Sequence, residues 1–158
     1  AGVEVSFEDV RDEFERIYQG EDSVSGLKLE ERLLIDRADL ENWSTRLPLA
    51  IVTARPRKDA EEFLDRFALR SYFSAVVTRE DAPSKPDPAP VRLALERLGV
   101  GRGWMFGDTV DDLRAAREAG VVPIGVAVPR DDRSALTPAA RIVESVNEIE
   151  EVLDATQS

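Results

Sequence analysis

An acidic cluster follows a short apolar run in residues 104–112, Trp-Met-Phe-Gly-Asp-Thr-Val-Asp-Asp. Asp108 and Asp112 are four positions apart, so a helix beginning here would direct both carboxylates toward one point. Carboxylate oxygens at this spacing suit an octahedral Mg²⁺ that keeps several of its waters. The alternative is helix capping, because acidic residues also stabilise a helix N-terminus. The run predicts a magnesium site at Asp108 and Asp112, with Asp111 a less favoured ligand.

Two other segments carry groups that suit phosphate. Thr53 and Ala54 follow an apolar run, and a threonine hydroxyl with the next backbone N–H groups at a strand-to-helix turn can bind phosphate. The alternative for Thr53 is a helix N-cap. Lys85, one of three lysines in the chain, lies in Ser-Lys-Pro-Asp-Pro at 84–88. It could hold a phosphoryl oxygen and neutralise a carboxylate. The alternative is a solvated loop lysine, although the flanking prolines favour a rigidly placed loop.

Histidine and cysteine are both absent from the 158 residues. Their absence excludes Ser-His-Asp and Cys-His nucleophile pairs, His-ligated zinc and disulfides. The 32 acidic residues outnumber the 21 basic ones, and the resulting net charge of −11 opposes nucleic acid binding. The longest apolar stretches, such as 121–128, are too short to cross a bilayer. The composition therefore predicts an acidic cytoplasmic protein with neither a nucleic acid nor a membrane partner, whose chemistry uses carboxylates, lysine, hydroxyls and a hard metal.

The elements that must position these residues alternate along the chain from residue 47 onward. Apolar runs predict strands at 47–53, 72–78, 104–106 and 121–128, with a short edge strand at 142–143. Helical spacing of apolar residues predicts helices at 57–67, 91–98, 111–119 and 146–153. Alternation of this kind predicts an α/β fold with a mostly parallel sheet and right-handed crossovers. Ligands bind such sheets at the carboxyl ends of the strands, where all three candidate segments lie.

The segment before residue 47 is helical in pattern. Ser6 and Asp9 resemble a capping box, and Val10, Phe14 and Ile17 recur at helical spacing until Gly20. Two further helical pieces are predicted at 27–34 and 38–43. We therefore expect two parts, residues 1–46 and residues 47–158.

The strand-end threonine, the loop lysine and the GDxxxD cluster, in this order and separated by one helix each, resemble motifs two, three and four of the haloacid dehalogenase superfamily. The stretches IVTARPRKDAEEFL, KPDPAPVRLALERLGV and WMFGDTVDDLRAAREAGVVPIGV are similar to the phosphoglycolate phosphatase-like subfamily that has an α-helical cap. The resemblance covers about 47–153. It implies a Rossmann-like three-layer α/β/α core at 47–158, with residues 1–46 as the remnant of the helical cap.

The resemblance implies a Mg²⁺-dependent phosphatase that acts on a small phosphorylated metabolite through an aspartyl-phosphate. Thr53 and the N–H of Ala54 would bind phosphate, and Lys85 would steady the phosphoryl group. Asp108 would ligate Mg²⁺, and Asp112 would support a metal-bound water or Lys85. Asp111 stands where relatives often have asparagine.

The first motif of the family, an apolar strand that ends in Asp-x-Asp, is absent from this sequence. In the family this strand lies between the strands that end here at Thr53 and Asp108. We therefore expect the edges of those two strands either to be unpaired or to be forced together. Two alternative functions follow: a non-catalytic module that binds phosphate and Mg²⁺, or a phosphomutase of the same fold. A dehalogenase is disfavoured because it has no use for the metal-binding acids.

Overall fold

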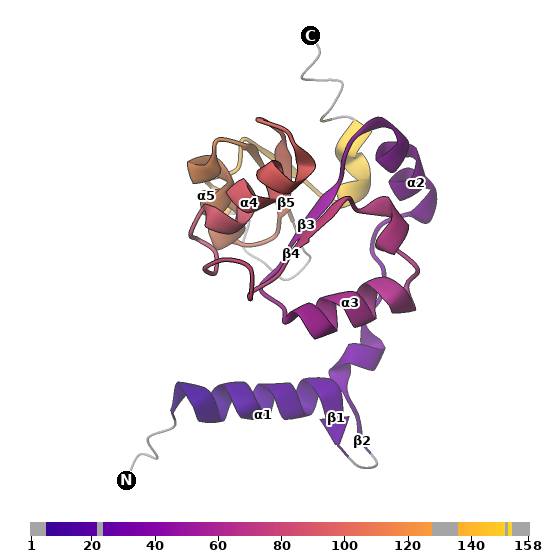
Figure 1. The fold of residues 1–158 in the computed structure, drawn as a ribbon, viewed down its shortest axis with the longest axis vertical. Helices are drawn as coiled ribbons and strands as arrows, with labels where there is room; N and C mark the ends of the chain where they lie inside the picture. Colours follow the sequence, from indigo (N-terminus) through magenta and orange to yellow (C-terminus); the bar gives the residue numbers. More distant parts are fainter. Residues whose placement is uncertain (1–5, 22–23, 128–135, 151, 153–158) are drawn as a thin grey trace. The chain divides into compact units, whose positions relative to one another are not determined.

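The computed structural model describes residues 6–21, 24–127, 136–150 and 152. The chain divides into two compact units, Ala1–Leu34 and Ile35–Ser158. Figure 1 traces both units, and each is described here by itself.

The first unit contains one helix and a small hairpin. Helix α1 (Phe7–Gln19) confirms the predicted first helix. It is followed by the antiparallel strands β1 (Gly20–Glu21) and β2 (Val24–Ser25) and by the 3₁₀ turn η1 (Leu27–Glu30). The helix predicted over 27–34 is therefore only one short turn. Leu27 and Leu29 are exposed, so no packing supports a longer amphipathic helix there.

The second unit begins before the predicted boundary at residue 47. Helix α2 (Arg37–Arg46) belongs to this unit because Leu40 and Trp43 are only 2% and 1% exposed. The Trp43 indole Nε1 donates a hydrogen bond to Glu150 Oε1 at 2.9 Å, and Figure 1 shows α2 beside the C-terminal segment. The contacts divide the chain after Leu34, whereas the sequence predicted a division after residue 46, and α2 is buried within the second unit.

All five predicted strands of the second unit are present and parallel. Strand β3 (Ala50–Val52) pairs with β4 (Ala75–Val77). Strand β5 (Trp104–Gly107) pairs with β6 (Val122–Val126), which pairs with β7 (Arg141–Val143). Within the described residues no ladder joins β3 to β5. The sheet is thus divided between the two strands whose edges were expected to be unpaired.

The helices follow the predicted alternation. Helix α3 (Arg57–Arg66) connects β3 to β4, α4 (Ala89–Leu98) connects β4 to β5, and α5 (Val110–Ala119) connects β5 to β6. Helix α4 starts two residues before the predicted start, because a proline is tolerated in the first helical turn. A 3₁₀ turn η2 (Arg70–Tyr72) precedes β4. After β7, η4 (Val146–Glu148) leads into helical residues 149, 150 and 152.

Consecutive residues of β5 show how the layers are arranged. Met105 and Phe106 point to opposite faces of the sheet because side chains alternate along a strand. Met105 packs against buried residues of α4 and α5, which Figure 1 shows beside β5. Phe106 packs against a cluster formed by Ile124, Val143 and Val152. This sheet is therefore covered on both faces, which confirms the α/β class. Among the described residues, no helix combines the length and the apolar character that a membrane span requires.

Candidate phosphate and metal site at the strand ends

Thr53 is the first residue after β3, and its side chain is bonded locally. The backbone N–H of Thr53 donates to Val77 O at 2.9 Å, which extends the pairing with β4. Its hydroxyl Oγ1 accepts from the backbone N–H of Arg55 at 3.2 Å. The N-cap of α3 is Pro56, so the capping alternative for Thr53 is wrong. The threonine shapes the turn between strand and helix, which is the place predicted for a phosphate-binding hydroxyl.

Lys85 is not a solvated loop lysine. Its Nζ donates to Val52 O at 3.3 Å and forms an ion pair with Asp112. The Lys85 side chain is 16% exposed and that of Asp112 is 8% exposed. Val52 ends β3, and Asp112 lies in the first turn of the helix after β5, so Lys85 bridges the carboxyl ends of the two strands between which no ladder is described.

The carboxylate of Asp112 has two further donors. Its Oδ2 accepts from the backbone N–H of Thr109 at 3.1 Å and from Thr109 Oγ1 at 2.6 Å, which completes a capping box at the start of α5. Burial alone would raise the pKa of Asp112, but Lys85 and Thr109 hold that pKa below its ordinary value. The carboxyl of Asp112 is therefore ionised at neutral pH, although its side chain is only 8% exposed.

Gly107 gives Asp112 the space that this arrangement needs. A Cβ placed on Gly107 would lie 2.3 Å from Asp112 Cβ and 2.9 Å from its Cγ. Real side chains do not approach so closely, so a larger residue would displace the carboxylate. The glycine of the GDxxxD cluster is thus required by packing.

The cluster contains two other acids besides Asp112, the ion-pair partner of Lys85. Asp108 is exposed at the end of β5, and Asp111 is half-buried in the first turn of α5. In the part of the chain that the structure describes, no three acidic side chains gather into a metal-binding group. A magnesium ion beside a phosphate needs only one or two protein carboxylates, because waters and phosphate oxygens complete its octahedron. An exposed Asp108 at the strand end fits that donor set.

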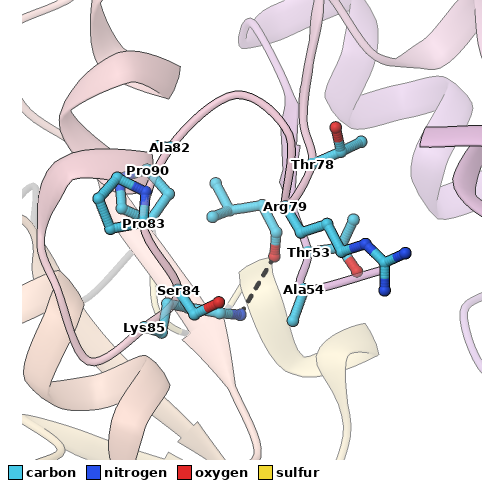
Figure 2. Close-up of a pocket in the computed structure, with 10 residues that line it drawn as sticks. Thr53, Ala54, Thr78, Arg79, Ala82, Pro83, Ser84, Lys85 and Pro90 are labelled. Carbon is cyan, nitrogen blue, oxygen red and sulfur yellow. Dashed lines mark hydrogen bonds between the residues drawn. The ribbon is translucent and has the colours of Figure 1, made fainter. Parts of the chain in front are cut away.

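A small hollow brings the predicted phosphate-binding residues together (Figure 2). It contains Thr53, Ala54 and Lys85, as predicted, and also Arg79, which sequence analysis missed. Arg79 follows directly after the predicted strand 72–78, and its position at a strand end was the signal that could have found it. The full lining comprises Val52, Thr53, Ala54, Thr78, Arg79, Ala82, Pro83, Ser84, Lys85 and Pro90.

The loop that carries Lys85 is held at its start by Asp81, another residue that sequence analysis missed. Oδ2 of Asp81 accepts from the N–H and hydroxyl of Thr78 at 2.8 and 2.9 Å. Its Oδ1 contacts Arg57 and Arg97, each at 2.7 Å. Arg97 first, then Thr78 and Arg57, hold the pKa of Asp81 well below its ordinary value. This network fixes the end of β4 between α3 and α4.

Comparison with known proteins identifies the family. The model of the haloacid dehalogenase-like hydrolases matches residues 40–126, which is more than half of the chain. This chain belongs to that family. The resemblance inferred from the motifs is thereby confirmed, and the match begins inside α2, in agreement with its place in the second unit.

Two curated relatives show how much of a longer protein the chain covers. It is 40% identical over 150 residues to an imidazoleglycerol-phosphate dehydratase of Phytophthora nicotianae. The aligned residues cover 89% of this chain and 33% of that protein. It is 35% identical over 118 residues to a phosphoglycolate phosphatase of Neisseria gonorrhoeae. This alignment covers 70% of this chain and 50% of that protein. The chain thus spans a third to a half of these relatives.

Solved structures agree with the fold. A HAD phosphatase from Thermococcus onnurineus superposes with a TM-score of 0.67 at 29% identity, over 74% of this chain and 55% of that one. A HAD-superfamily hydrolase from Geobacter sulfurreducens superposes with a TM-score of 0.63 at 31% identity, over 74% of this chain and 53% of that one.

Proposed function

We propose that the protein to which residues 1–158 belong is a Mg²⁺-dependent phosphatase of a small phosphorylated metabolite, acting in the cytoplasm. One observation carries the proposal: Thr53 and Lys85 line one hollow at the strand ends, and Lys85 is held there by Asp112. Family membership supports the same chemistry.

Each residue has a separate task in this proposal. The Thr53 hydroxyl and the Ala54 N–H bind phosphoryl oxygens, and the Lys85 ammonium stabilises the negative charge that develops on them. Asp112 positions Lys85 and keeps it from turning to solvent. Asp108 holds Mg²⁺, Asp112 supports a metal-bound water as well as Lys85, and Asp111 is a less favoured ligand. The metal supplies positive charge that offsets the charges of phosphate and carboxylates.

The nucleophilic aspartate has to come from a strand that residues 1–158 do not contain. We propose that this strand lies between β3 and β5. The Thr53 N–H faces β4, so the preceding carbonyl of Val52 faces the opposite, unpaired edge of β3. Lys85 binds that carbonyl. A strand added at this edge would end near the Lys85 ammonium, where an aspartate could attack phosphorus and form the aspartyl-phosphate.

We assign the first unit to the helical cap that the resemblance implies. Its exposed apolar side chains are consistent with an element that packs against further chain; they are Phe14, Ile17, Leu27, Leu29 and Leu34.

The test is phosphate release by the complete gene product that contains these residues. The panel comprises p-nitrophenyl phosphate, sugar phosphates, phosphoglycolate and imidazoleglycerol phosphate; the last two appear in the names of relatives. We expect release that needs Mg²⁺ and that falls about 100-fold or more in Asp108→Asn, since a metal ligand is lost. Asp36→Asn is the matched control, because Asp36 is exposed and its side chain caps no helix. Absence of release with Mg²⁺, or release unaffected by Asp108→Asn, refutes the proposal.

Two alternatives give different results in the same experiments. A non-catalytic module is favoured by the presence of Thr53 and Lys85 in a chain that has no Asp-x-Asp. It predicts that residues 1–158 bind orthophosphate in calorimetry only when Mg²⁺ is present, while the complete gene product releases none. A phosphomutase predicts transfer of the phosphoryl group within a sugar phosphate at a higher rate than release.

A further inference from the structure

The charged residues that line the hollow at the strand ends are both basic, although the chain as a whole is strongly acidic. The net charge of the sequence is −11, yet the two charged residues that line the hollow are Arg79 and Lys85. Lys85 is neutralised by Asp112, with which it forms an ion pair. Arg79 also has an acidic neighbour, but this ion pair is looser, with 3.6 Å between Arg79 Nε and Glu80 Oε1.

The backbone on either side of Arg79 is held by hydrogen bonds. The preceding Thr78 is 1% exposed and is bonded to Asp81 through both its N–H and its hydroxyl. The N–H of Arg79 donates to Arg55 O at 3.3 Å, which ties the loop after β4 to the loop after β3. Figure 2 shows the Arg79 side chain extending from the end of β4 toward Thr53. Arg79 thus lines, from an ordered stretch of backbone, the hollow that contains the proposed phosphate site.

Glu80, the acidic neighbour of Arg79, contacts the guanidinium only loosely, so the guanidinium can bind another anion. The closest approach of Glu80 is from Oε1 to Arg79 Nε at 3.6 Å, longer than a hydrogen bond, and both side chains are 46% exposed. The other oxygen of Glu80 accepts from the backbone N–H of Arg57 at 3.0 Å, so this carboxylate is held toward α3. An exposed pair of this length contributes little stability and gives way easily to a better oxyanion.

We propose that Arg79 binds a second anionic group of the substrate, so that the site selects phosphate esters that also carry a carboxylate or a second phosphate. The guanidinium fork matches both groups because it donates two parallel hydrogen bonds to paired oxygens. The inference rests on the proposed phosphate site, in which Thr53 and Lys85 bind the reacting phosphoryl group. Arg79 then binds the anionic group at the other end of the substrate.

The experiment compares two ligands that differ in one group. Phosphoglycolate and 2-hydroxyethyl phosphate have the same length, but only the first has a carboxylate. Calorimetry in Mg²⁺ measures the affinity of residues 1–158 for both and for orthophosphate. We expect Arg79→Gln to weaken phosphoglycolate binding about tenfold, the loss expected for one charged hydrogen-bonded contact, and to change 2-hydroxyethyl phosphate binding less than twofold. Pyrophosphate replaces phosphoglycolate in a second arm, which shows whether a phosphate serves as the second group.

Matched variants distinguish recognition of the carboxylate by Arg79 from a general effect of the positive charge of the protein. Arg102→Gln removes the same charge from an exposed residue before β5, at the amino ends of the strands, and should leave all affinities unchanged. Arg79→Lys keeps the charge but loses the fork, and should give an intermediate affinity for phosphoglycolate. If Arg79→Gln weakens the binding of both esters equally, or of neither, Arg79 does not bind a second anionic group of the substrate. That result would leave the proposed phosphate site unaffected. A wild-type chain that binds neither orthophosphate nor either ester refutes the phosphate site as well.

Discussion

Removal of the Lys85 ammonium should leave a buried charge without its partner. In Lys85→Met the methionine fills the space of the aliphatic stem, while Asp112, 6% exposed, loses its ion pair. Loss of one partner from a buried pair costs about 3–5 kcal/mol. Asp112 keeps two donors from Thr109, so we expect the lower end, a fall of about 3 kcal/mol in the free energy of unfolding at pH 7.

The pH dependence distinguishes this cause from simple loss of packing. In the wild type, Lys85 and Thr109 lower the pKa of Asp112, so its contribution to stability is present above the ordinary value of 3.8 and is lost as the pH falls through the folded-state value. Without Lys85, burial is opposed by the Thr109 hydrogen bonds alone, so the pKa of Asp112 in the folded variant is higher than in the folded wild type, and its carboxyl takes up a proton at higher pH. The difference in unfolding free energy between wild type and variant should therefore shrink as the pH falls from 7 toward about 4.

Urea denaturation followed by circular dichroism at several pH values measures these differences. Lys58→Met is the matched control, because Lys58 is 77% exposed and its Nζ lies 3.9 Å from Glu62 Oε1; the expected change is below about 0.5 kcal/mol. A double-mutant cycle with Asp112→Asn isolates the pair. A cost of Lys85→Met that is the same at every pH, or the same in the Asp112→Asn background, would show that the ion pair is not its cause.

Two further perturbations follow from the packing, and the same urea titrations measure both. Gly107→Ala should lower the unfolding free energy by about 1–3 kcal/mol because its methyl group displaces the carboxylate at the start of α5. Gly101→Ala, which meets nothing within 4 Å, should stay within about 0.5 kcal/mol, and equal costs for the two variants would contradict this account. A fragment of residues 35–158 should keep the unfolding midpoint of the second unit, whereas a fragment of residues 47–158 should lose stability because two buried side chains of α2 are removed; equal midpoints would restore the boundary at residue 47.

The elements could be predicted because each carries its own signal. The five strands of the second unit are short apolar runs, and the helices between them repeat apolar residues at helical spacing. Gly99 and Gly120, which mark the predicted ends of two helices, adopt φ of 68° and 82° after α4 and α5. The predicted helix at 27–34 failed because periodicity alone cannot supply the packing partner that a short helix needs.

Some residues of the candidate site could be chosen from the sequence because residue type at a strand end is a local signal. Thr53, Lys85 and Asp112 each stood out at a strand end by residue type. Asp81 and Arg79 did not, because a charged residue in a loop looks like any solvated residue until its neighbours are known. The neighbours of Asp81 are Arg57 and Arg97, which lie 24 and 16 positions away in the chain.

The sequence by itself determined the α/β class, the order of the strands along the chain and the residue types at their carboxyl ends, because all of these depend on local patterns. Only the tertiary structure decided that α2 belongs to the second unit, through contacts such as that between Trp43 and Glu150, 107 residues apart. It also decided that Lys85 joins Val52 to Asp112, and that the sheet is divided between β3 and β5. Contacts between distant segments depend on how the elements pack, and the spacing of residues along the chain does not contain that information.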